Sequence, residues 1–317
     1  MPASTTAHTA ALPTETFYED RGTGPALLLV HGHPFDHTMW QPQIDRFSRT
    51  HRVIAPDLRG YGATPLGTHP APTHPGSPGS DATHTGSPGS DATHTGSPGS
   101  DATHTDPTGP DPTATAPRSL GLDVFAEDLV ALLDALEIDD CVLAGLSMGG
   151  QIAMELYRRH PGRVRGLVLA DTFPAAETDE GRKARNAMAD RLLREGMRGY
   201  ADEVLDRMVA PYNTHAAPHV HRMMCATDPV AAAAALRGRA ERADHRHTLT
   251  TVAVPALVVV GRDDSYTPVA DAEEMHALLP HATLAVIDRA AHLPNLERPE
   301  EFDAVLESYL RSLVRTS

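Results

Sequence analysis

The sequence predicts an α/β protein with a doubly wound, mostly parallel sheet and a helical cap, and three observations indicate this fold class. Short apolar runs alternate along the chain with amphipathic segments, which is typical of parallel strands covered by helices on both faces. Residues 174–250 interrupt this alternation, because they contain no convincing strand and carry methionine and leucine at helical spacing. The chain has 317 residues, 40% of them hydrophobic, which is enough for one large core.

Six near-continuous apolar runs are expected to form the strands of the sheet. They are residues 26–30, 53–55, 141–144, 167–170, 256–260 and 283–287. Amphipathic segments predict four core helices, at residues 123–137, 151–160, 271–279 and 300–314. We therefore expect a core made of residues 1–66, 118–173 and 251–317, with the helical cap at 174–250.

One stretch is expected to lie outside this core. Residues 76–105 are three identical copies of GSPGSDATHT, within a segment, 67–117, made almost entirely of small and polar residues. This composition cannot bury enough apolar surface to offset the entropy of ordering, so we interpret 67–117 as a disordered insertion. Weak metal binding by its five histidines and a role in protein interaction stay open, although histidines ten residues apart define no coordination geometry.

The charge balance excludes several classes of partner. Lys and Arg number 27 against 42 Asp and Glu, a formal charge of -15, so the chain lacks the basic surface that binds nucleic acid or anionic lipid. No apolar run approaches the roughly 20 residues of a membrane span, and the first residues lack the features of a secretory signal. Only two cysteines are present, which favours a reducing compartment, and we expect a cytoplasmic protein.

A nucleophile is predicted at the turn between two of these elements. Residues 145–149, GLSMG, form a G-x-S-x-G pattern after the apolar run at 141–144 and before an amphipathic segment. A sharp strand-to-helix turn needs small flanking residues and exposes the serine oxygen at the end of the sheet. The N-terminus of the following helix helps to stabilise developing negative charge. The pattern therefore predicts that Ser147 is a nucleophile.

A serine nucleophile needs a general base and an acid that orients the base, and in this architecture the acid precedes the histidine in the chain. Asp263 and Asp264 follow the apolar run at 256–260, and His292 follows the last run. His292 is therefore the predicted base. The acid is one of these two aspartates, with Asp171, after the run at 167–170, as an alternative.

The loop after the first predicted strand is expected to complete the site. Residues 31–34, HGHP, occupy the position that supplies one main-chain N–H group of an oxyanion hole, while the residue after the nucleophile supplies the other. His33 and Met148 are therefore the predicted donors, and His31 is expected to anchor the loop. The substrate pocket is expected to include the side chains of His33, Phe35, Met188 and Met208.

One further motif is interpreted as structural, and no metal site is predicted. Residues 57–62, DLRGYG, have neither a Walker lysine nor the G-x-G-x-x-G spacing of a phosphate-binding loop. No group of His, Cys, Asp and Glu has the spacing of a metal site. We therefore expect no metal and no cofactor.

Five segments together resemble successive signatures of the α/β-hydrolase superfamily: LLLVHGHPFDHTMW, APDLRGYG, AGLSMGGQIAMELYRRHPGRV, VVVGRDDSYTP and AAHLPNLERPEEF. Within it, HGHPFDHTMW, GLSMGG and LVLADTFPAAETDEGR resemble the branch of 3-oxoadipate enol-lactonase-like proteins and related carboxylesterases. The resemblance implies a triad of Ser147, Asp264 and His292, with Asp264 preferred to Asp263 because the family spacing is Gly-x-x-Asp. Two features depart from the family: His33 stands where an aromatic or small apolar residue is common, and the insertion has no expected counterpart.

These observations together predict a serine hydrolase that cleaves a carboxylic ester or lactone of a small molecule through an acyl-enzyme intermediate. Amide hydrolysis, perhydrolysis and acyl transfer need the same residues and differ in leaving group or acceptor, so they stay open as alternatives. A non-enzymatic small-molecule receptor that keeps the triad is the alternative from a different class.

Overall fold

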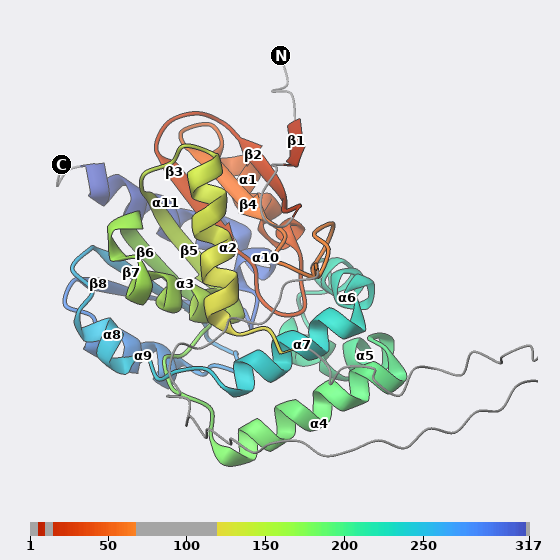
Figure 1. Ribbon diagram of the computed structural model, residues 1–317. Coiled ribbons are helices and arrows are strands. Elements are labelled where there is room, and N and C mark those ends of the chain that lie inside the picture. Colours follow the sequence, from red (N-terminus) through yellow and green to blue (C-terminus); the bar gives the residue numbers. More distant parts are fainter. Residues whose placement is uncertain (1–5, 10–14, 68–118, 315–317) are drawn as a thin grey trace, which may run out of the picture. The chain divides into compact units, whose positions relative to one another are not determined.

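The computed structural model describes residues 6–9, 15–67 and 119–314, in which eight strands form a single sheet (Figure 1). The strands are β1 (Thr6–Thr9), β2 (Phe17–Arg21), β3 (Ala26–Val30), β4 (Arg52–Pro56), β5 (Cys141–Leu146), β6 (Val164–Ala170), β7 (Ala256–Gly261) and β8 (Ala282–Ile287). Their order across the sheet is β1-β2-β4-β3-β5-β6-β7-β8. The strands from β4 to β8 in this order pair in parallel, while β2 is antiparallel to both of its neighbours. The predicted doubly wound, mostly parallel sheet is confirmed.

All six predicted strands are present, and the sequence analysis missed two more, β1 and β2. β2 has the sequence FYEDR and lies near one edge of the sheet. Because it is short and largely charged, it has no apolar run that would mark it as a strand. No local sequence pattern therefore predicts β2, which is held in the sheet by antiparallel pairing with β1 on one side and β4 on the other.

Helices cover both faces of the sheet, and each face has its own core cluster. One face packs against α2 (Leu122–Ala135), α3 (Met148–Arg159), α8 (Arg246–Thr250) and α9 (Val269–Leu278). The other packs against η1 (His37–Trp40), α1 (Gln41–Phe47), α10 (Pro294–Glu297) and α11 (Pro299–Val314). Side chains alternate along β3, with Leu28 and Val30 in the first cluster and Leu27 and Leu29 in the second. This alternation explains why β3 reads as an unbroken apolar run.

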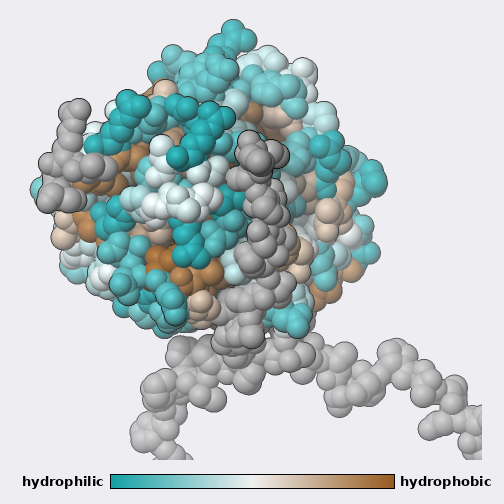
Figure 2. All heavy atoms as spheres, turned by 90° about the horizontal axis from the view of Figure 1, so that it is seen from above, coloured by the Kyte–Doolittle hydropathy of each residue, from teal (hydrophilic) through white to brown (hydrophobic). Residues whose placement is uncertain are grey.

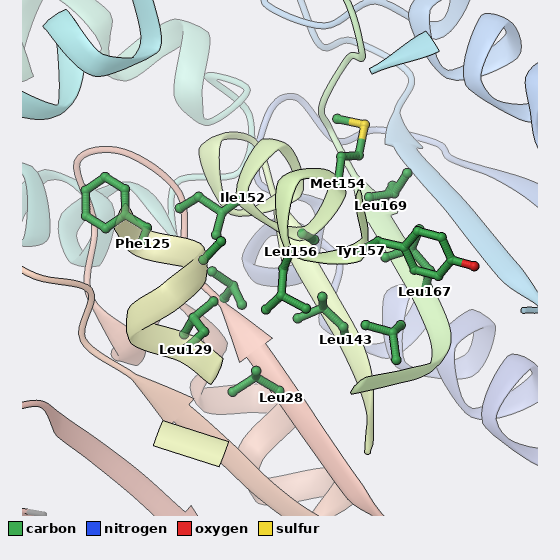
Figure 3. Packing of buried hydrophobic residues seen from close by; sticks show 14 of the residues in the cluster. Leu28, Phe125, Leu129, Leu143, Ile152, Met154, Leu156, Tyr157, Leu167 and Leu169 are labelled. Carbon is green, nitrogen blue, oxygen red and sulfur yellow. The ribbon is translucent and has the colours of Figure 1, made fainter. Parts of the chain in front are cut away.

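The first cluster joins the central strands to α2 and α3 (Figure 3). Leu28 and Leu143 extend from β3 and β5 toward Phe125 of α2 and Ile152 of α3, and all four side chains are fully buried. Burying one such side chain contributes about 1.5–3 kcal/mol. The cluster thus fixes α3 on the sheet, and with it the turn that precedes α3.

A helical insertion separates β6 from β7. It contains α4 (Asp179–Glu195), α5 (Arg198–Met208), α6 (Ala217–Ala226) and α7 (Pro229–Ala240), and no strand lies between Ala170 and Ala256, a stretch that is described throughout. α4 packs against α7, and α5 against α6. The short helix α8, which the sequence analysis grouped with the cap, packs instead against α3 and α9 of the core. The segment 67–117, predicted to be disordered, falls outside the described residues except for Gly67.

The surface in Figure 2 is mostly hydrophilic, with small separate hydrophobic patches. Among the described residues, three large hydrophobic side chains are clearly exposed, namely Leu193, Tyr212 and Val230. None of the described helices is long and apolar enough to cross a lipid bilayer.

Candidate active site

Ser147 lies at the sharp turn between β5 and α3. Its backbone angles, φ 57° and ψ -115°, are unusual for a residue with a side chain, and such conformations persist only where the surroundings enforce them. Here the Ser147 N–H donates to the carbonyl of Ala170 (2.9 Å), and the Ser147 carbonyl accepts from the Thr172 hydroxyl (2.8 Å). A Cβ atom on Gly145 would lie 2.2 Å from the carbonyl oxygen of Gly149. The turn therefore requires glycine at that position.

His292 and Asp264 lie in one hydrogen-bonded row with Ser147. His292 Nε2 is 2.9 Å from Ser147 Oγ, and His292 Nδ1 is 2.8 Å from Asp264 Oδ2. Asp264 also accepts hydrogen bonds from the Tyr266 N–H (2.7 Å) and from the Thr267 hydroxyl. Burial opposes the ionisation of Asp264, but His292 and these donors outweigh it and lower its pKa. The three residues thus meet at the carboxyl ends of β5, β7 and β8.

Of the two neighbouring aspartates, only Asp264 reaches His292. Asp263 is exposed and accepts a hydrogen bond from the Tyr212 hydroxyl. The side chains of consecutive residues at a strand end point in different directions, so a shift of one position places Asp263 at the surface. The family spacing had indicated the residue that the structure places against the histidine.

Asp171, the alternative acid, lies behind Asp264 and is not hydrogen-bonded to His292. Its Oδ1 accepts from the Gly261 N–H (2.8 Å), and its buried Oδ2 has no partner among the described residues. Burial first, and then the negative charge of Asp264, hold the pKa of Asp171 well above its ordinary value. The Asp171 carboxyl group therefore keeps its proton to a higher pH than an ordinary aspartate does.

Two groups of side chains among the described residues bring three potential metal ligands together, but in each group the histidine is already hydrogen-bonded to protein atoms. In the group of Asp171, Asp264 and His292, both ring nitrogens of the histidine bond to protein atoms. In the group of Asp36, His37 and Asp57, Asp57 pairs with the His37 ring (2.7 Å), and Asp36 accepts from the Thr38 N–H (2.8 Å). Neither arrangement provides the free, convergent donors of a metal site.

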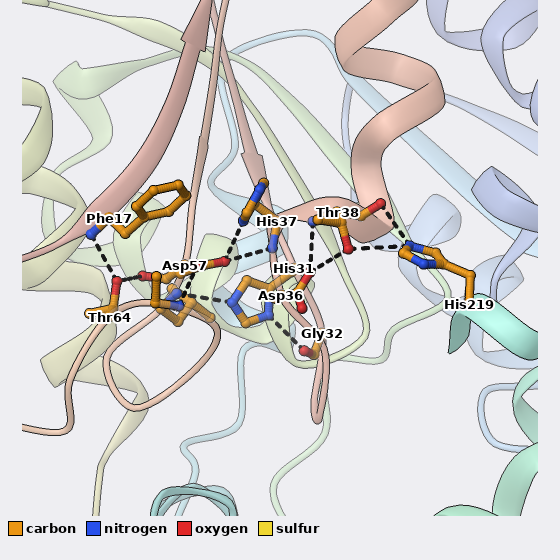
Figure 4. A network of polar contacts seen from close by, with 11 residues as sticks. Phe17, His31, Gly32, Asp36, His37, Thr38, Asp57, Thr64 and His219 are labelled. Carbon is orange, nitrogen blue, oxygen red and sulfur yellow. Dashed lines mark hydrogen bonds and ion pairs between the residues drawn. The ribbon is translucent and has the colours of Figure 1, made fainter. Parts of the chain in front are cut away.

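The loop at residues 31–34 lies directly against the Ser147 turn. A Cβ atom on Gly32 would be 3.2 Å from the Ser147 Cβ and 3.1 Å from the Leu146 carbonyl oxygen, which are tight contacts, so glycine favours this close approach. His31 anchors the loop, since its Nδ1–H donates to the Gly32 carbonyl (2.8 Å) and its Nε2 accepts from the Leu58 N–H (2.9 Å). Figure 4 shows further hydrogen bonds around this loop, in which Asp57 accepts from the His37 N–H (2.8 Å) and Asp36 accepts from the Thr38 N–H (2.8 Å).

The predicted oxyanion donors flank this contact between the loop and the turn. Met148 is the first residue of α3, and the first N–H groups of a helix have no carbonyl partner within the helix. His33 is the next residue after Gly32, and its ring lines the same cavity as Ser147. The two segments that carry the predicted donors are thus adjacent.

The cavity at Ser147 has a volume of about 160 Å³. Besides Ser147 and His292, it is lined by His33, Gln151, Thr172, Phe173, Arg185, Tyr200, Met208, Leu236, Arg239, Tyr266 and Thr267. His33 hydrogen-bonds through Nδ1 to the Tyr61 hydroxyl (2.7 Å). Burial, with the positive charges of Arg239 and Arg185, holds the pKa of His33 well below its ordinary value, so its ring is neutral at pH 7.

Two of the four predicted pocket side chains, His33 and Met208, line this cavity, while Phe35 and Met188 do not. Phe35 is fully buried and packs in the second core cluster. Its N–H donates to the Gly32 carbonyl (3.1 Å), which closes a tight turn in the loop and directs the ring toward the core. Met188 packs between helices of the insertion. The direction of a side chain on a packed helix or a tight turn depends on tertiary contacts, which the sequence does not display.

The sequence analysis missed Arg185 and Arg239 on the cavity wall. A signal for Arg239 was present, since it lies in AAAAALRGRA, a segment apolar enough to be buried on all sides. A charged residue in such a helix is unusual unless it is paired or faces a functional site. Arg185, by contrast, lies among the charged residues of α4, where nothing in the sequence distinguishes it from solvent-exposed positions.

Comparisons with known proteins agree with this fold. A family model described as "Alpha/beta hydrolase family" matches residues 27–305. The chain is 26% identical to 3-oxoadipate enol-lactonase 1 of Acinetobacter baylyi, over 91% of this chain and 90% of that protein. It is 30% identical to a pimeloyl-[acyl-carrier protein] methyl ester esterase of Neisseria meningitidis, over 59% of this chain and 63% of that protein.

Solved structures show the same architecture. A malate-bound thermophilic esterase from Thermogutta terrifontis superposes with a TM-score of 0.78 at 29% identity, covering 98% of this chain and 99% of the other. The enol-lactonase from Burkholderia xenovorans LB400 has a TM-score of 0.73 at 22% identity, covering 96% of this chain and all of the other. This second likeness is one of fold.

Proposed function

The chain belongs to the alpha/beta hydrolase family, and from this premise we propose that it is a serine hydrolase that cleaves a carboxylic ester or lactone of a small molecule. The observation that carries the proposal is the row of hydrogen bonds from Asp264 through His292 to Ser147. A serine hydroxyl at its ordinary pKa is a weak nucleophile, and such a row activates it. All three side chains are more than nine-tenths buried, so the row is shielded from competing water.

In the first half of the reaction, the Ser147 oxygen attacks the ester carbonyl while His292 Nε2 takes its proton. Asp264, ionised at neutral pH because its pKa is lowered, holds the imidazole and stabilises the imidazolium that forms. The main-chain N–H groups of His33 and Met148 bind the oxyanion of the tetrahedral intermediate. By analogy with other hydrolases, each such donor stabilises the transition state by about 3–4 kcal/mol.

In the second half, the intermediate collapses and His292 returns its proton to the departing alcohol oxygen. The acyl group is then bonded to Ser147 Oγ. Water attacks this acyl-enzyme with His292 again acting as the base, and the acid product leaves with the serine regenerated. For a lactone the alcohol and the acid are parts of one molecule, so both are released together at this second stage.

The relatives support an ester or lactone as the substrate. The names of the two curated relatives describe an enol-lactonase and a methyl ester esterase, and the solved structure with the higher TM-score is that of an esterase. Enol-lactones and methyl esters share the reacting group, an acyl carbon bonded to oxygen. We therefore favour hydrolysis of this bond over amide cleavage, perhydrolysis or acyl transfer.

Turnover of a short-chain chromogenic ester tests the proposal. We expect p-nitrophenyl acetate or butyrate to release p-nitrophenolate over many turnovers, and we expect this release to be lost in Ser147→Ala. A small-molecule receptor on the same fold would give at most a few turnovers, which would contradict the enzyme assignment.

A further inference from the structure

We propose that the substrate carries a free carboxylate, which Arg239 and Arg185 bind on the wall of the cavity that contains Ser147. The inference rests on the proposed hydrolase function and adds a substrate class to it. In chemical terms, the substrate is a short ester or lactone with one negative charge in addition to the bond that is cleaved.

The charge of the cavity wall is opposite to that of the whole protein. The chain carries a formal charge of -15, yet two arginines line the cavity, and no Asp or Glu is among the described residues that line it. A concave site lined by one sign of charge attracts the opposite sign. The wall is therefore complementary to an anion in a protein that otherwise repels anions.

Arg239 is a buried cation without a counter-charge. It is 7% exposed, and its one hydrogen bond to the described residues runs from Nε to Gln151 Oε1 (3.2 Å). Burial first, and then the positive charges of Arg185 and Arg242, lower its pKa well below the ordinary value. A buried guanidinium that is left unpaired is costly, and a carboxylate in the adjacent cavity would remove that cost.

Arg185 lines the same cavity and pairs with Glu177, an acid that it shares with Arg242. Glu177 accepts hydrogen bonds from Arg185 Nε and from Arg242 Nη1 (2.6 Å). Burial alone would raise the pKa of Glu177, but the two arginines outweigh burial and lower this pKa to about 2. One carboxylate is thus shared by two guanidinium groups. The contact uses Nε of Arg185 and leaves its two terminal nitrogens without a hydrogen bond to the described residues.

A second, independent observation is a polar atom at this cavity that has no partner. His33 lines the cavity and is 3% exposed, and its Nε2 has no hydrogen-bond partner among the described residues. Buried polar atoms are rarely left unsatisfied. The centroid of the His33 ring lies 6.5 Å from that of Tyr200, which also lines the cavity. A bound polar group would supply partners that the protein itself does not provide.

The size of the cavity limits the substrate. A volume of about 160 Å³ lies below the range of about 300–1,000 Å³ found for drug-sized ligands, so the cavity suits a short chain. A carboxylate can take parallel hydrogen bonds from a guanidinium, which adds orientation to affinity. Together these features favour a short monoanionic ester over a long neutral one.

A matched pair of substrates tests the proposal directly. The monomethyl and dimethyl esters of succinate or glutarate differ in one free carboxylate and share the reacting bond. We expect the wild type to have a kcat/KM at least tenfold higher for the monoester. In Arg239→Gln and Arg185→Gln this preference should fall by about tenfold or more, toward equal kcat/KM for the two esters, as expected for the loss of a charge-assisted hydrogen bond.

Lys183→Gln is the matched control, because it removes one positive charge from α4 at an exposed position outside the cavity wall. Its ratio of monoester to diester kcat/KM should equal that of the wild type at the same ionic strength. An equal fall in Lys183→Gln would show that net charge, and not the two arginines, sets the preference.

A measurement on the wild type covers the case in which Arg239→Gln fails to fold. Succinate or glutarate should inhibit the cleavage of a neutral ester competitively, and the matching diamide should inhibit at least tenfold more weakly. If the wild type cleaves neutral esters but shows neither the monoester preference nor this inhibition, the carboxylate subsite is wrong and the hydrolase proposal stands. If it cleaves no ester at all, including chromogenic ones, the proposed function itself is wrong.

Discussion

Asp171 lies beside Asp264 with both carboxyl groups buried, yet the pKa values of the two groups are shifted in opposite directions. The Asp264 pKa is lowered by His292 and by local donors, while burial and the charge of Asp264 raise the pKa of Asp171. When two carboxyl groups share a buried site, the charge of one disfavours the ionisation of the other. Asp264, the residue that contacts the histidine, therefore ionises at the lower pH of the two.

Asp264→Asn is expected to reduce kcat by about 10⁴-fold, because the amide favours the wrong imidazole tautomer, as in other triads. Asp263→Asn is the matched control, since Asp263 is the preceding residue and is exposed. It should keep kcat within about threefold of the wild type. Steady-state kinetics on a chromogenic ester measures both, and equal losses would show that the acid is misassigned.

Asp171→Asn is expected to keep kcat within about tenfold at pH 7, because His292 is hydrogen-bonded to Asp264 and not to Asp171. It also tests the raised pKa through stability. When the folded state holds a proton more tightly than the unfolded state, stability falls as pH rises from the unfolded pKa toward the folded one. The asparagine variant lacks this loss, so its Tm relative to wild type should rise between pH 4 and pH 8. A Tm difference that does not change with pH would contradict a protonated Asp171.

Glu297 ties the loop of His292 to the helical insertion, and its replacement should affect both stability and rate. Its carboxylate accepts from the N–H groups of Ala291 (2.9 Å) and Leu293 (3.2 Å), on either side of His292. It also accepts from the Ala210 N–H (2.8 Å) and the Asn213 side chain (2.7 Å). In Glu297→Gln, the amide NH2 group replaces one of the two accepting oxygens and faces N–H groups that then have no acceptor. This change should lower the free energy of unfolding by about 3 kcal/mol.

Urea unfolding and kcat should change together in Glu297→Gln, because the bonds that it breaks hold the backbone on both sides of His292. Glu301→Gln, which removes a partly exposed ion pair with Arg298, is the control and should cost less than about 1 kcal/mol. Similar losses in the two variants would show that Glu297 has no special role.

Replacing residues 68–117 with a Gly/Ser linker is expected to keep kcat/KM within tenfold of the full chain. The segment lies outside the described residues, and the expectation comes from its composition and from the slow growth of loop-closure cost with length. Both flanks belong to the core, since Leu66 packs against it and the Leu120 N–H bonds to the Ala234 carbonyl (3.0 Å). Thermal melting and ester kinetics check this, and a larger fall in kcat/KM at unchanged Tm would mean that the segment acts on the active site.

The parts of the site that follow from local rules were predictable from the sequence. Ser147 is marked by the small residues that its turn requires, and His292 by its place after the last core strand. Asp264 was separated from Asp263 only through the family spacing, because the two residues are chemically alike. Arg239 and Arg185 escaped prediction because they meet only when α4 and α7 pack, a contact between helices that are distant in sequence. Contacts of the same helices turn Met188 away from the cavity, and the tight loop at residues 31–34 turns Phe35 into the core.

Labelling with a fluorophosphonate, followed by peptide mass mapping, tests the central claim most directly. If Ser147 is the activated nucleophile, the wild type takes one label, on Ser147, and esterase activity is lost in proportion to labelling. Ser147→Ala should take no label, and its kcat should fall by several orders of magnitude. A label on another serine, or full esterase activity in Ser147→Ala, would contradict the account.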